Sequence, residues 1–112
     1  VVHHLADSEM TSAIRLRRMI AEDEPLLVGY DQEEFARRLY YTRPIAGSLL
    51  ALAGARFSTA DFLEAFQESD WERFGHHNEY QAPYTVIEWL EYYAEHAHDH
   101  ADQIRRSREA AR

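Results

Sequence analysis

The first 23 residues of the chain contain neither glycine nor proline, and their apolar side chains recur at helical spacing. Side chains three, four and seven positions apart lie on one face of a helix. That face holds Val1, Leu5, Ser12, Leu16 and Met19. We therefore expect a helix that ends in the acidic segment before Pro25, with one apolar face buried against other elements.

Two further helices are indicated in the middle of the chain. Asp31 stands at an N-cap position with Glu34 three residues later, a capping-box-like pattern that predicts a short helix through Tyr41. Pro44 opens a third helix that runs to about Glu68. Most of its apolar surface comes from Ile45, Leu49, Leu52, Phe57, Leu63 and Phe66. Two glycines either weaken this helix locally or let a neighbouring helix pack closely, and they are Gly47 and Gly54.

The last third of the chain begins with a non-helical stretch, residues 69–83, and returns to helix afterwards. Thr85 is the expected N-cap, Glu88 takes the capping-box position, and the helix runs to near the C-terminus. Because no segment shows strand-like alternation, the fold class is all-α, an antiparallel bundle in one domain of residues 1–112. Three long helices and one short one are visible, so a missing first helix is expected upstream of Val1.

Composition excludes several classes of function. The formal net charge is −8 at pH 7 with a pI near 5.3, whereas nucleic-acid binding relies on a basic surface. The absence of cysteine excludes disulfides, thiolate ligands and a cysteine nucleophile. No apolar run approaches the roughly 20 residues of a membrane span, and no signal-like start is present. We expect a cytoplasmic protein with neither nucleic-acid nor membrane partners.

Two histidines of the last helix are the first candidate metal ligands. At about 100° per residue, an apolar stripe of this helix holds Val86, Leu90, Tyr93, Ala97 and Ile104. His100 lies within about 30° of the centre of that stripe, and His96 lies one turn away on its shoulder. Two imidazoles at i and i+4 can bind one metal ion. Without a third ligand, the simpler interpretation is that both are ordinary helix histidines.

His4 is the candidate third ligand. It begins a row along the edge of the first helix's apolar stripe, where an interior site of a bundle would be lined, and the row continues through Ser8, Thr11 and Arg15. A divalent cation would satisfy a ring nitrogen of each buried imidazole at once. His3 lies about 100° away around the helix and is expected at the surface or behind the ligands.

The remaining candidate residues receive structural interpretations. A zinc protease needs glutamate directly after the first histidine of HExxH, and that position is Ala97 here, so we discount a protease. We expect loop packing or solvent exposure for His76 and His77. An aromatic set is expected in the core more than in a pocket, and it comprises Tyr84, Trp89, Tyr92 and Tyr93. The last arginines suit a solvated helix end, and they are Arg105, Arg106 and Arg108.

Two separated motifs resemble a known family. The segment Val1–Met10, continuing through Arg15 to Asp31, closely resembles a helix and turn of the DinB-like superfamily, especially its YfiT-like branch. The segment His96–Ile104 is similar to the same family's second signature, HxxxH followed by a Gln/His-Ile ending. The resemblance covers most of the chain in order, including a loop such as 74–85.

The resemblance implies a four-helix bundle with a metal site. The positions that match the family's ligands are His4, His96 and His100, and the metal is described as nickel or zinc with waters completing the shell. YfiT-like members are described as metal-dependent hydrolases, and related ones transfer small thiols such as bacillithiol or mycothiol. The chain departs from the family pattern at Glu9, where histidine is usual, and after the HxxxH motif, where it has Asp99, Asp102 and Gln103.

These observations lead to three hypotheses. The first is a metal-dependent enzyme, because an ion held by three neutral histidines lowers the pKa of bound water or binds a small thiol as thiolate. Candidates for orienting a ligand imidazole or moving a proton are Asp7, Glu9 and Asp99. The second is a non-catalytic, stress-associated protein that keeps the metal for stability, and the third is a bundle without metal. A homodimer acting on a small molecule is expected for the enzyme.

Overall fold

The computed structural model describes residues 1–79, 82–95 and 105–106. Its helices are α1 (Val2–Ala21), α2 (Gln32–Arg38), α3 (Ala46–Glu64) and a 3₁₀ turn, η1 (Glu68–Glu72). Residues 86–95 are also helical. Three short strands join them, β1 (Leu26–Leu27), β2 (Phe74–His77) and β3 (Tyr84–Thr85). None of the helices in this part of the chain is long and apolar enough to cross a membrane.

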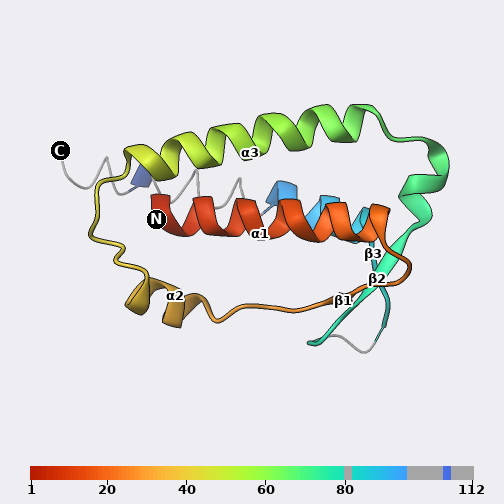
Figure 1. Ribbon diagram of the computed structural model, residues 1–112, viewed down its shortest axis with the longest axis horizontal. Helices are drawn as coiled ribbons and strands as arrows, with labels where there is room; N and C mark the ends of the chain where they lie inside the picture. Colours follow the sequence, from red (N-terminus) through yellow and green to blue (C-terminus); the bar gives the residue numbers. More distant parts are fainter. Residues whose placement is uncertain (80–81, 96–104, 107–112) are drawn as a thin grey trace.

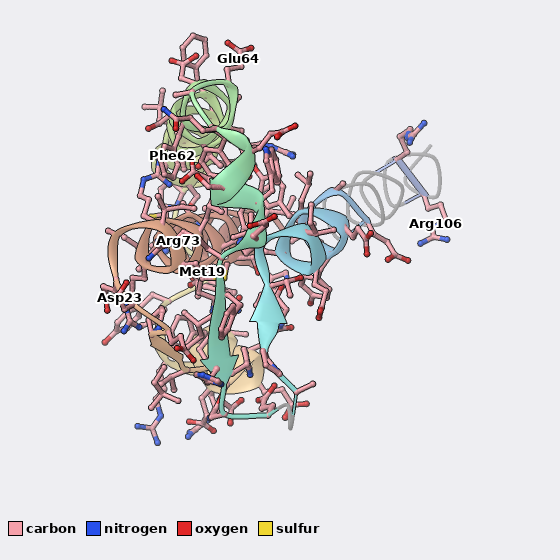
Figure 2. All side chains as sticks on the ribbon, turned by 90° about the vertical axis from the view of Figure 1, so that its right-hand side faces the viewer. Met19, Asp23, Phe62, Glu64, Arg73 and Arg106 are labelled. Carbon is pink, nitrogen blue, oxygen red and sulfur yellow. The ribbon has the colours of Figure 1, made fainter. Side chains whose placement is uncertain are left out.

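Helix α1 lies at the centre, with α3 along one side and residues 86–95 along another (Figures 1 and 2). The α1–α3 contacts advance together in sequence, since His3 meets Ser48 and Arg17 meets Thr59. These two helices are therefore parallel, and the expectation of a wholly antiparallel bundle was wrong. The connection through residues 22–45 is long enough to return the chain to the starting end of α1, as a parallel neighbour requires (Figure 1).

The predicted helix starts are confirmed at two positions. Asp31 accepts a hydrogen bond from the main-chain N–H of Glu34 at 3.1 Å, which caps α2. Thr85 accepts one from the N–H of Glu88 at 3.1 Å and donates to the Glu88 carboxylate at 3.3 Å. Both caps satisfy N–H groups that a helix start otherwise leaves without a partner. Helix α3 ends at Glu64, four residues before the predicted end, because η1 follows.

Arg73 binds the last carbonyl groups at the C-terminal end of α1. Its guanidinium donates to the carbonyl of Met19 at 2.7 Å and to that of Glu22 at 2.8 Å, and lies 3.4 Å from Asp23 (Figure 2). The last carbonyls of a helix have no partner within it, and a cation there also suits the helix dipole. This contact ties β2, which follows Arg73 directly, to the end of α1.

The three strands are a feature that the sequence analysis missed. They form one sheet in the order β1-β2-β3, in which β2 is parallel to β1 and antiparallel to β3. A Cβ at Gly75 would lie 2.9 Å from the carbonyl oxygen of Pro25 and 3.0 Å from Leu27, so only glycine lets these strands approach. Strands of two to four residues are too short to show alternation in the sequence.

The core is built around Trp89. It is 2% exposed and packs with Leu16, Met19, Leu27 and Val86, all of which are fully buried. The expected stripe of α1 is confirmed at Leu16 and Met19. The predicted stripe was wrong at the start of the helix, where Val1 is 48% exposed. The buried side chains there are polar, namely His3, Ser8 and Glu9.

Helix α3 buries only part of the apolar face expected, since Leu63, and Phe66 just after the helix, pack against the core. Its buried residues are Ser48 and Thr59, while several of the predicted apolar contacts are largely exposed, namely Ile45, Leu49 and Phe57. The glycines of α3 do not mediate close packing either. Among the described residues, a Cβ at Gly47 or Gly54 would meet no atom of another segment within 4 Å.

Candidate functional site

A polar cavity of about 100 Å³ lies beside α1 on the same side as His4. Three members of the predicted row line it, Ser8, Thr11 and Arg15, and His4 stands one helical turn before Ser8 and is half-buried. The opposite walls come from the turn before α2, from β2 and β3, and from the last helical segment. They include Gly29, Tyr30, His77, Glu79, Tyr84 and Tyr92.

Arg15 supplies a positive charge to this cavity. Its guanidinium donates to the carbonyl of Val28 at 3.0 Å, while its Nε–H is buried without a hydrogen-bond partner among the described residues. Arg15 makes no ion pair with an acid in the part of the chain that the structure describes. A guanidinium has five N–H donors, so most of its hydrogen-bonding capacity remains for solvent or a ligand.

Two hydroxyl groups meet across the cavity. The Ser8 Oγ and the Tyr30 Oη lie 2.7 Å apart, which joins α1 to the turn before α2. Burial raises the pKa of the Tyr30 hydroxyl, against the lowering effects of its hydrogen bond to Ser8 and of the Arg15 charge. Tyr30 is therefore a neutral phenol that can donate or accept a hydrogen bond at physiological pH.

His77 lies on the β2 wall and is buried. Burial and, after it, the nearby Arg15 charge lower the pKa of its imidazole, so the ring is neutral at physiological pH. Its Nδ1 accepts a hydrogen bond from the N–H of Glu79 at 3.1 Å. A neutral imidazole with Nδ1 as acceptor carries its hydrogen on Nε2. His77 is thus packed, which is one of the two expected alternatives, but in a strand and not in a loop, whereas His76 is exposed and contacts Glu24.

The acids proposed to assist a metal have other partners. Asp7 accepts a hydrogen bond from the Tyr41 hydroxyl at 2.6 Å, and burial raises the pKa of that tyrosine. Glu9 is 4% exposed and lies 3.1 Å from Arg56 of α3. Burial raises its pKa, while the neighbouring Tyr93 hydroxyl and Arg56 lower it. Asp99 lies outside the described residues.

His3 is a structural residue, not a surface one. It is 3% exposed, its Nδ1 lies 2.6 Å from the Ser48 hydroxyl, and its Nε2 lies 2.8 Å from the carbonyl oxygen of Arg43. The carbonyl can only accept, so Nε2–H donates to it and Nδ1 accepts from Ser48. Both ring nitrogens of His3 are occupied, so neither is available to bind a metal ion.

The complete three-histidine site cannot be assembled from the described residues. His96 and His100 lie outside them, and no group of three His, Asp or Glu side chains suited to a metal occurs within residues 1–79, 82–95 and 105–106. Of the three predicted ligands the structure describes His4, on the row of α1 that borders the cavity.

Sequence reasoning missed part of the cavity. Trp89, Tyr93 and Tyr84 belong to the core and its edge, as expected, but Tyr84 also lines the cavity, together with Tyr92. The spacing of three and four residues between Ser8, Thr11 and Arg15 did indicate this wall of the cavity, since it places them on one face of α1. His77 gave no such signal, because its place depends on how β2 pairs with β1.

Comparison with known proteins assigns the family. The model of the DinB superfamily matches residues 1–104 of the chain. The chain belongs to the DinB superfamily. This DinB-like chain is 33% identical over 104 residues to "Putative metal-dependent hydrolase OB0782" of Oceanobacillus iheyensis, which covers 93% of the chain and 60% of the relative. It is 30% identical over 105 residues to "Putative metal-dependent hydrolase YfiT" of Bacillus subtilis, covering 93% of the chain and 59% of that relative.

A solved structure shares the fold. The structure of Bacillus subtilis YfiT, described as a probable metal-dependent hydrolase with an unusual four-helix bundle topology, superposes with a TM-score of 0.89 at 28% identity. The match covers 98% of this chain and 64% of the other. The predicted family and fold class are confirmed. The chain spans about three fifths of the length of these relatives.

Proposed function

We propose that this DinB-like protein is a divalent-metal-dependent enzyme whose ion is held by His4, His96 and His100. The observation that carries the proposal is the half-buried position of His4 on the row of α1 that lines a polar cavity. A ligand position next to a cavity suits catalysis, because the substrate needs access to the ion. The names of the relatives, which describe metal-dependent hydrolases, agree with it.

The direction of the last helical segment supports the proposed ligand set. Trp89 donates to the carbonyl of Ser12, and Tyr93, one turn later, neighbours Glu9. The segment therefore runs toward the N-terminal end of α1, which is the end that carries His4. In the sequence, His96 follows Tyr93 by three residues.

The donor set fits zinc or nickel. Neutral imidazoles suit these ions, and three of them leave coordination positions open for water or substrate. When bound, the ion would supply a Lewis acid for hydrolysis or for the activation of a small thiol such as bacillithiol or mycothiol. The chain's own cavity residues would bind and orient the substrate through Arg15, His77 and the hydroxyl groups of the walls.

Metal analysis of the protein purified without a nickel column tests the ligand set. We expect about one ion per chain in the wild type, and its loss in His4→Ala and His100→Ala, with helical circular dichroism unchanged. His76→Ala is the matched control, because its imidazole is exposed and contacts Glu24 and the Phe74 ring, neither of which is a proposed ligand. Absence of stoichiometric metal from the wild type, or full retention in His4→Ala, would contradict the proposal.

A second assay separates thiol transfer from hydrolysis. The metal-loaded protein is incubated with bacillithiol or mycothiol and monobromobimane, and conjugate formation is followed by fluorescence. Turnover that disappears in His100→Ala supports a thiol S-transferase. Turnover of activated esters without thiol, with the same dependence on His100, supports a hydrolase. If neither reaction proceeds in protein that holds its metal, the site binds metal without catalysing these reactions.

A further inference from the structure

The cavity holds a cationic side chain that no acid neutralises within the described residues. Arg15 uses one donor on the Val28 carbonyl and has its Nε–H buried without a partner. Arg18, one turn further along α1, makes a similar bond to the Leu26 carbonyl but also pairs with Glu22 at 3.0 Å. A partly buried guanidinium without a counter-ion is costly unless an anion or water completes its hydrogen bonds. Within the described residues Arg15 therefore lacks the acidic partner that Arg18 has, and its remaining donors suit an external anion.

The groups around Arg15 suit a small oxyanion. The neutral His77 carries its hydrogen on Nε2, and the walls add hydroxyl donors such as those of Ser8 and Tyr30. The volume of about 100 Å³ holds several water molecules, or an anion of the size of acetate or phosphate. Guanidinium groups bind carboxylate and phosphate through two parallel hydrogen bonds.

Glu79 is the one acid that lines the cavity among the described residues. It is exposed, and its carboxylate stands over Gly29, where an added Cβ would lie 3.0 Å from it. An exposed carboxylate is solvated and screened, so it weakens an anion site less than a buried one would. It also provides a test, because its removal should strengthen the binding of an anion.

We propose that the cavity binds a carboxylate or phosphate group at the far end of the substrate from the reacting centre, with Arg15 as its main contact. This inference rests on the proposed function for the position of the reacting centre at His4. His4 and Arg15 lie on one row of α1, eleven positions apart, or about 16 Å along the helix axis. The substrate or thiol co-substrate is therefore elongated, with its reactive group and its anionic group at opposite ends.

Nuclear magnetic resonance of the arginine side chains tests this proposal directly. The chain has twelve arginines and no lysine, so its Nε–Hε signals are few enough to assign by single substitution. Sodium acetate and inorganic phosphate are titrated separately into the full chain as purified and after loading with zinc. We expect the Arg15 signal to shift and saturate with at least one of them, which identifies the preferred group. The Arg18 signal should remain unshifted.

Three variants make the test specific. The affinity for the preferred anion, followed through the His77 ring signals, should fall at least tenfold in Arg15→Gln and less in Arg15→Lys, which keeps the charge. It should stay unchanged in Arg18→Gln and rise in Glu79→Gln. Unchanged affinity in folded Arg15→Gln, or no saturable shift with either anion, would overturn the proposal. Weaker binding in Glu79→Gln would also overturn it, since that result indicates a ligand with positive charge.

The test of the anion site can fail or succeed independently of the test of the metal-dependent enzyme. Metal content depends on the histidines and should be the same in Arg15→Gln as in the wild type. Loss of metal-dependent turnover with intact anion binding would contradict the enzyme and leave the anion site standing. Metal-dependent turnover with equal kcat/KM in Arg15→Gln, for substrates with and without the anionic group, would contradict the anion site alone.

Discussion

Trp89 donates its indole N–H to the main-chain carbonyl of Ser12 at 2.9 Å, and this hydrogen bond fixes the last helical segment against α1. The indole ring is 2% exposed and stacks on Tyr93 with ring centroids 4.7 Å apart. The carbonyl of Ser12 lies within a continuous helix, so it accepts this bond in addition to the one from the helix itself. One side chain thus sets both the packing and the register between two helices that carry the proposed metal ligands.

Trp89→Phe should lower the free energy of unfolding by about 1–3 kcal/mol, because it removes the hydrogen bond and leaves a space in the core. Urea unfolding followed by circular dichroism measures the change. Trp71→Phe is the control, since Trp71 is only partly buried at the edge of the core and should lose less. Equal losses in the two variants would show that the contact with Ser12 contributes nothing specific.

Local signals in the sequence were sufficient for the helices but not for their arrangement. Asp31 and Thr85 cap helices as predicted, since capping depends on residues three positions apart. The parallel packing of α1 and α3 depends on contacts more than forty residues apart, such as His3 with Ser48. The short strands depend in the same way on Gly75 approaching Pro25. No local pattern contains that information.

His3→Ala should destabilise the fold and leave metal binding intact. The substitution leaves the Ser48 hydroxyl and the Arg43 carbonyl without their imidazole partner in a buried position, at a cost of about 1–3 kcal/mol. Thermal unfolding and metal content are measured on the same preparation. His4→Ala is the matched variant at the next residue. It should lose the metal and leave the fold intact. Loss of metal together with an unchanged unfolding temperature in His3→Ala would mean that the two roles are exchanged.

The face of α1 that sequence analysis expected to be apolar is partly polar, and this difference locates the site. Ser8 and Glu9 are buried where an ordinary bundle helix would place aliphatic residues. Ser8 contributes to the cavity, and Glu9 meets Arg56 of α3. The place of Ser8 on a polar row was visible in the spacing within α1, whereas the burial of Glu9 follows from its partner Arg56 on another helix, which that spacing could not reveal.

Alanine at two glycines should change stability in opposite directions. In α3, a Cβ at Gly54 would meet none of the described segments within 4 Å, so Gly54→Ala should stabilise the protein by about 1 kcal/mol through helix propensity. In β2, a Cβ at Gly75 would lie 2.9 Å from the Pro25 carbonyl oxygen, so Gly75→Ala should destabilise it. Urea unfolding of both variants gives the two signs. A stabilising effect of Gly75→Ala would contradict the close approach of β1 and β2.

Glu9 should make the stability of the protein depend on pH in an unusual direction. Burial raises the pKa of its carboxyl above the ordinary value of 4.5, despite the lowering effects of Tyr93 and Arg56. A raised pKa in the folded state means that the protonated form is favoured there. The resulting stabilisation is fully present below about pH 4.5 and is lost as the pH rises through the raised pKa. Glu9→Gln should therefore gain stability relative to the wild type as the pH increases.

Glu22 provides the opposite case on the same helix. Its hydrogen bond from Arg18 lowers the pKa of its exposed carboxyl, so its contribution is present above the ordinary value and is lost as the pH falls. Urea unfolding of the wild type, Glu9→Gln and Glu22→Gln between about pH 4 and pH 8 compares the two slopes. The stability difference from the wild type should change in opposite directions with pH in the two variants. Parallel slopes would mean that burial of Glu9 does not control its titration, and that the ion pair with Arg56 outweighs it.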